Sequence, residues 1–136
     1  MNKIVIDTNI LVSALYRPEG TPGRILDLVI NGQALLCYDS RIISEYMEVL
    51  ARPKFQFNLN KVNELIELLV DMGLSVVPAP SIIEMPDEDD RMFYEVAKAS
   101  DASLITGNSK HFPDEPFIFT AAEYLKAVLQ TPNEDE

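Results

Sequence analysis

Hydrophobic residues in this chain occur in two kinds of segment: short, nearly continuous runs, and longer stretches in which apolar residues recur every three or four positions. The short runs are rich in aliphatic and β-branched residues and end at polar residues, glycine or proline, which is typical of buried strands. We predict five strands, at residues 4–6, 34–38, 75–77, 103–106 and 117–119.

The longer stretches predict amphipathic helices, because a spacing of three to four residues places apolar side chains on one helical face. These helices are expected at residues 10–16, 21–31, 40–52 and 60–73, with two more beginning after residues 90 and 120. The expected N-terminal caps are Thr21, Asp39, Asn60 and Thr120, the last in a capping box with Glu123.

Strands that alternate with helices favour a parallel sheet covered by helices on both faces. The predicted fold is therefore α/β, a three-layer α/β/α sandwich around a mainly parallel five-stranded sheet. Residues 1–130 form one domain in this interpretation, and residues 131–136 form an acidic, flexible tail. Open sheets of this kind carry their binding sites at the carboxyl ends of the strands.

The composition excludes several classes of protein and of metal site. Hydrophobic residues make up 47% of the chain, which is enough for a core, and the net charge of −11 argues against a passive nucleic-acid clamp. The single cysteine, Cys37, excludes an internal disulfide and a cysteine-based zinc site. No apolar run is long enough for a signal peptide or a membrane span, so we expect a cytoplasmic protein with no membrane partner.

Acidic residues gather near the ends of predicted strands and the starts of helices. Asp7 directly follows the first strand, Glu45 borders the apolar face of its helix, and Asp87, Asp89 and Asp90 crowd the start of another. Each has an ordinary structural explanation, as a helix cap or as a glutamate at the edge of a buried face. Three aspartates in four residues exceed what a cap needs, however, and their repulsion has to be offset by a cation or by solvent.

Asn108, after the fourth strand, offers either a turn or a neutral oxygen ligand at the same edge of the sheet. Divalent cations such as Mg²⁺ and Mn²⁺ prefer oxygen ligands of this kind. We therefore predict a site for Mg²⁺ or Mn²⁺, which suits phosphodiester hydrolysis by water without a nucleophilic side chain. The same aspartates at strand ends also fit a metal-dependent phosphatase or a receiver-like domain, which is the less favoured alternative.

Three segments resemble the motifs of PIN-domain proteins. IVIDTNILVSAL resembles the first motif, SEYMEVLARPKF the second, and PDEDDRMFYEVAKASDASLITGNSKHFP the third and fourth together. Their order and spacing agree with the family, and the similarity runs to about residue 125. The resemblance is greatest to the VapC-like subgroup, toxins of bacterial toxin–antitoxin pairs, and it implies an Mg²⁺- or Mn²⁺-dependent ribonuclease that cuts single-stranded RNA.

The resemblance also implies a role for each matching residue. Asp7, Glu45 and Asp90 take the three acidic, metal-ligating and catalytic positions, and Asp90 lies sixteen residues before Thr106, as the family pattern expects. The fourth catalytic position is Asn108, where many relatives carry aspartate. The residues expected to support the site are Thr8, Asn9, Asp87, Asp89 and Thr106.

The resemblance further implies an antitoxin partner, and the apolar helix faces are compatible with a homodimer. The neutral Asn108 and the negative net charge favour one alternative, a catalytically weak or inactive PIN-like module that binds RNA or protein. His111, the single histidine, is interpreted as a surface residue outside the site, with phosphate contact or proton transfer as its alternative roles.

Overall fold

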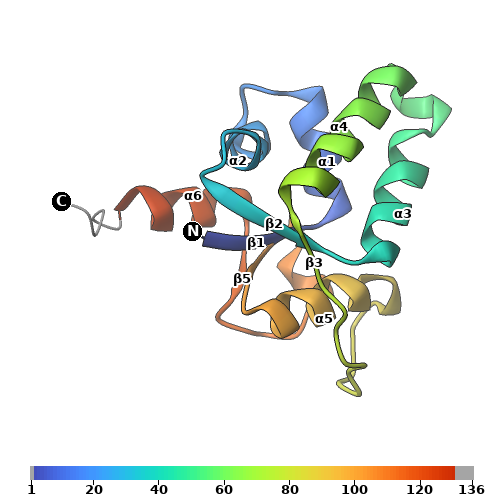
Figure 1. Ribbon diagram of the computed structural model, residues 1–136. Helices are drawn as coiled ribbons and strands as arrows, with labels where there is room; N and C mark the ends of the chain where they lie inside the picture. The colour runs from blue at the N-terminus through green and yellow to red at the C-terminus, as the bar shows by residue number, and fades with distance from the viewer. Residues whose placement is uncertain (1, 131–136) are drawn as a thin grey trace.

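A five-stranded parallel sheet forms the centre of the computed structural model, which describes residues 2–130 (Figure 1). The predicted acidic tail at 131–136 lies outside the described residues. The strand order is β3-β2-β1-β4-β5, and every neighbouring pair is parallel, as predicted. The strands are β1 (Asn2–Ile6), β2 (Ala34–Tyr38), β3 (Leu74–Ser75), β4 (Ser103–Ile105) and β5 (Ile118–Phe119).

Six α-helices complete the sandwich and confirm its three predicted layers. Helices α1 to α4 lie on one face of the sheet and α5 lies on the other, while α6 packs against α2 and β5 (Figure 1). The helices are α1 (Thr8–Tyr16), α2 (Thr21–Ile30), α3 (Ser40–Leu50), α4 (Leu59–Met72), α5 (Arg91–Ser100) and α6 (Ala121–Gln130). Three short 3-10 helices are inserted between them: η1 (Pro53–Phe55), η2 (Glu88–Asp90) and η3 (Ser109–His111).

The central strand β1 is almost completely inaccessible along Ile4, Val5 and Ile6, because helices cover both of its faces. Burial of such side chains contributes roughly 1.5–3 kcal/mol each, which makes β1 a main source of stability. The pairing of Ile6 with Ile105 aligns the carboxyl ends of β1 and β4. Residues that follow these two strands are therefore neighbours at one edge of the sheet.

Two predicted helix caps were wrong by one or two residues. The carbonyl of Gly20, rather than that of Thr21, accepts the first helical bond of α2, at 3.1 Å from Arg24 N. The side chain of Asn58, rather than that of Asn60, caps α4. Differences of one or two residues are usual at helix ends. The caps at Asp39 and at the Thr120 capping box are confirmed.

The third strand begins and ends earlier than predicted, at Leu74–Ser75 instead of 75–77. Gly73 lets the chain pass directly over β2, since a side chain there would lie 2.6 Å from the carbonyl oxygen of Leu36. After Val76 N donates to Tyr38 O at 2.8 Å, the chain leaves the sheet. Pro78 follows soon after, and proline cannot donate to the ladder.

Candidate active site

Asp7 lies at the carboxyl end of β1 and is buried, with 6% of its surface exposed. Its Oδ2 accepts a hydrogen bond of 2.8 Å from the hydroxyl of Thr106, which follows β4 and is completely buried. Thr106 Oγ1 also accepts a bond of 3.1 Å from the backbone N–H of Asn108. The Asp7 side chain makes no cap hydrogen bond of good geometry in α1, although the nearby backbone N–H groups of Asn9 and Thr8 lower its pKa.

Glu45 lies half-buried on α3, and its Oε2 accepts a hydrogen bond from the hydroxyl of Thr8. Thr8 is the first residue of α1 and is itself buried next to Asp7. On the same turn of α3, the buried hydroxyl of Tyr46 donates to the carbonyl of Ile6. These two bonds attach α3 to the carboxyl end of β1, so that Glu45 shares this edge of the sheet with Asp7.

Asp90 ends η2 and precedes α5, but its side chain caps neither helix. Its Oδ2 is buried and accepts no hydrogen bond from the described residues. Asp87, in contrast, does act as a cap, because its Oδ1 accepts a bond of 3.0 Å from Asp89 N. Asp89 is exposed. Among the three aspartates of this segment, Asp90 is therefore the one that places a buried oxygen without a hydrogen bond in the site.

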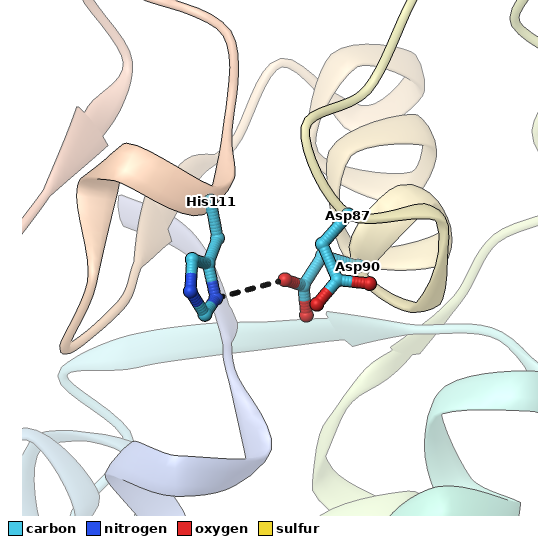
Figure 2. A group of neighbouring side chains, drawn as sticks. All are labelled: Asp87, Asp90 and His111. Atoms are coloured by element: carbon cyan, nitrogen blue, oxygen red, sulfur yellow. Dashed lines mark ion pairs between the residues drawn. The ribbon is translucent and has the colours of Figure 1, made fainter.

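His111 approaches Asp90 from the opposite side of the site, and the two form an ion pair when the imidazole is protonated (Figure 2). Asn108 Nδ2 lies 3.0 Å from His111 Nε2, and His111 Nδ1 lies 3.4 Å from Asp90 Oδ2. The possible ligand atoms of Asp87, Asp90 and His111 all lie within 4.8 Å of one another. Asp7 stands outside this tight group and is linked to it through Thr106 and Asn108.

The carboxylates of the site influence one another electrostatically. Burial is the main cause that raises the pKa of Asp7, of Glu45 and of Asp90, the last to about 6. The charge of Asp7 further raises the pKa of both other residues, and Asp87 adds to the effect on Asp90. Acids that disfavour one another's ionisation in this way form a site where a cation is stabilising.

The sequence of residues 3–110 matches the family model of the PIN domain. The chain belongs to the PIN domain family. A curated relative, an uncharacterized protein of Methanocaldococcus jannaschii, is 34% identical over 109 residues, which cover 78% of this chain and 70% of the relative. The predicted family and fold class are therefore confirmed.

Two solved structures share the PIN fold. VapBC2 from Rickettsia felis, crystallised with a DNA fragment from its promoter, has a TM-score of 0.56 at 16% identity, and the similarity covers 87% of this chain and 96% of that one. VapBC-1 from nontypeable Haemophilus influenzae has a TM-score of 0.52 at 21% identity, covering 80% of this chain and 89% of that one. At these identities the likeness concerns the fold alone.

The PIN match contains every residue that the sequence predicted for the site, and it ends one residue before His111. Of the predicted residues, Asn9 is exposed on the first turn of α1, and Asp89 faces solvent. The others lie at the common edge of the sheet. His111 is the residue that sequence reasoning set aside. The sequence offers little indication of this role for His111, because Asp90 lies 21 residues away and no local pattern predicts the contact.

No helix among residues 2–130 combines the length and the apolar composition that crossing a membrane requires.

Proposed function

We propose that this PIN-domain chain is a metal-dependent endoribonuclease that hydrolyses single-stranded RNA, with Asp7, Glu45, Asp90 and Asn108 as its catalytic residues. The observation that carries the proposal is the gathering of three half-buried or buried carboxylates at one edge of the sheet, each with a raised pKa. Residues from three separate segments contribute to this gathering. Such an arrangement costs stability unless a ligand compensates for it.

The donor set fits a divalent cation. Asp90 Oδ2 is a buried oxygen without a hydrogen bond among the described residues, and most buried polar atoms have a partner. Carboxylate and amide oxygens suit Mg²⁺ and Mn²⁺, and Asp7, Glu45 and Asp90 would hold the ion. When bound, such an ion lowers the pKa of water and stabilises negative charge on the scissile phosphate.

The residues of the chain itself would position these groups. Thr106 holds the Asp7 carboxylate, and Thr8 holds that of Glu45, so neither side chain has to be ordered when a ligand arrives. Asn108 is neutral where many relatives carry aspartate, so it would orient water or a neighbouring side chain through its amide. The exposed position of Asn108 leaves room for a phosphate group above the carboxylates.

We further propose that the chain is the toxin of a toxin–antitoxin pair. The two structures with the same fold are VapBC complexes, and the sequence resembles the VapC-like subgroup. A partner that places an arginine or lysine among the carboxylates would block the site by charge-assisted hydrogen bonds. Self-association through apolar helix faces, and a cytoplasmic location, stay predictions.

The test is cleavage of a fluorescent single-stranded RNA during titration with Mg²⁺ or Mn²⁺. Wild type should cut the RNA only with metal, and EDTA should stop the reaction. Asp7→Asn and Asp90→Asn should each lower the rate at least about a hundredfold, because each removes a charge that holds the ion. Asp27→Asn, which alters an exposed acid on α2, is the matched control and should retain full activity.

The neutral Asn108 favours a second candidate, a PIN-like module that binds RNA without cutting it. RNA binding by the wild-type chain with no cleavage at any metal concentration would support that candidate and exclude the nuclease. Cleavage that survives in both aspartate variants would show instead that another site, or a contaminant, performs the reaction.

A further inference from the structure

His111 faces Asp87 and Asp90 across a gap that is suited to one cation (Figure 2). The possible ligand atoms of the three residues lie within 4.8 Å of one another, and His111 Nδ1 is 3.4 Å from Asp90 Oδ2. Two ligands that bind one ion at about 2.1 Å are separated by roughly 3.0–3.4 Å in octahedral or tetrahedral geometry. The spacing between the imidazole and the carboxylate is therefore that of neighbouring ligands of one ion.

A second observation concerns the same carboxylate oxygen, whose contact with His111 Nδ1 is an ion pair only when the imidazole is protonated. Asp90 Oδ2 is buried and accepts no hydrogen bond from the described residues. Leaving a buried carboxylate oxygen unpaired costs free energy, so such an atom in a native structure has a functional reason or a missing partner. A cation bound to this oxygen would also be within reach of His111 Nδ1, which faces it.

Asn108 contacts the imidazole on the ring nitrogen that faces away from Asp90. Its amide lies 3.0 Å from His111 Nε2, and its backbone N–H is fixed to Thr106 Oγ1 at 3.1 Å. Asn108 Oδ1 accepts a bond of 3.3 Å from Lys110 N, so the amide has to turn and give up this weak bond before its oxygen can face the ring. When the turned amide accepts a hydrogen bond from Nε2–H through Oδ1, Nδ1 presents its lone pair towards Asp90. Metal-binding histidines are commonly held by a carbonyl in this way.

We propose that His111 Nδ1 is a ligand of a divalent cation held by Asp87 and Asp90, with Asp90 shared with the site of Asp7 and Glu45, and that Asn108 is the residue that positions the imidazole. The proposal rests on the metal dependence proposed above. In this role Asn108 orients a nitrogen ligand without adding negative charge, which an aspartate at the same position would do. Imidazole binds Mn²⁺ in preference to Mg²⁺, so the site should favour Mn²⁺.

The experiment is Mn²⁺ and Mg²⁺ binding to the full chain without RNA, measured by calorimetry and by electron paramagnetic resonance of bound Mn²⁺. Wild type should show magnetic coupling between Mn²⁺ and a nitrogen nucleus. In His111→Ala this coupling should disappear, and Mn²⁺ affinity should fall about tenfold or more, with Mg²⁺ affinity changed less. Asn108→Ala should weaken Mn²⁺ binding by a smaller factor. Lys110→Ala, an exposed change on the same short helix, is the control and should bind like wild type.

The outcomes separate this proposal from the proposed function. If wild type binds Mn²⁺ and cuts RNA without nitrogen coupling, and His111→Ala binds Mn²⁺ equally well, the histidine ligand is refuted and the nuclease stands. If wild type binds neither ion, the metal-dependent nuclease fails as well. Should His111→Ala fail to fold, as judged by circular dichroism, the presence or absence of nitrogen coupling in wild type decides the question.

Discussion

Thr106 and Asp7 are joined by a buried hydrogen bond of 2.8 Å, although they lie 99 residues apart in the chain. Thr106→Val keeps the size of the side chain but removes this donor, and the pKa of Asp7 should rise further because the bond lowers it. We expect metal affinity and RNA cleavage at neutral pH to fall by about tenfold, the value of one hydrogen bond to a charged group. Thr106→Ser, which keeps the hydroxyl, should behave like wild type, and equal activity of Thr106→Val would contradict this role.

The hydroxyl of Thr8 positions Glu45 in the same manner. Thr8→Val should lower the cleavage rate by about tenfold while the chain stays folded, because the freed carboxylate samples other rotamers. A double-mutant cycle provides the measurement. In a Glu45→Gln background, Thr8→Val should have little further effect, since the two residues act as a unit. Fully additive effects would mean that Thr8 acts on something other than Glu45.

Asp90 should reduce the stability of the metal-free chain at neutral pH. Its folded-state pKa is raised from 3.8 to about 6, mainly by burial, so the folded chain favours the protonated form. The resulting stabilisation is fully present below about pH 3.8 and is lost as the pH rises through about 6. In EDTA at pH 7.5, Asp90→Asn should therefore be more stable than wild type by roughly 1–2 kcal/mol.

Thermal unfolding at several pH values measures this difference. The advantage of Asp90→Asn should shrink at pH 4, where wild-type Asp90 is protonated as well. Addition of Mn²⁺ should stabilise wild type and leave the variant nearly unchanged, because only wild type offers the charged ligand. A variant that is less stable than wild type at pH 7.5 without metal would show that Asp90 has a structural partner.

Arg41 joins the start of α3 to α5 through the buried carboxylate of Glu95, at 2.9 Å. Arg41→Ala leaves Glu95 buried without its cation, and we expect a loss of about 2 kcal/mol in unfolding free energy. Arg52→Ala is the matched control on the same helix, because its partner Glu48 is exposed and such surface pairs contribute little. Urea unfolding measures the unfolding free energy of the two variants. Equal decreases in both would mean that the burial of Glu95 does not strengthen the contribution of its ion pair to stability.

Local patterns were sufficient to predict much of the fold. The strand at residues 34–38 was located without error, because its apolar run is continuous and both flanks are polar. The position of Asp7 at the edge of the sheet was also predicted, since a charge directly after a buried strand must reach that edge, but its role in the site came only from the family resemblance. Capping by Asp39 followed from local chemistry, which requires no knowledge of the tertiary structure.

Contacts between distant segments could not be predicted in this way. The interaction of His111 with Asp90 depends on how η3 and η2 pack against each other, and the sequence of one segment does not indicate its contact with the other. The same holds for Glu95, which a helical pattern places on α5 but whose burial results from Arg41 of α3. The third strand was misplaced because the close approach of Gly73 to β2 determines its start.

The pairing of β1 with β4 has a consequence for how the protein is made. The ribosome synthesises Asp7 about a hundred residues before Thr106. The hydrogen bond from the Thr106 hydroxyl to the Asp7 carboxylate can therefore form only after almost the whole domain has been translated. An unfinished chain released before β4 has every residue up to Asp90 and still lacks the strand that aligns them. If the full-length chain cuts RNA as proposed, truncated translation products should therefore leave the cell's RNA intact.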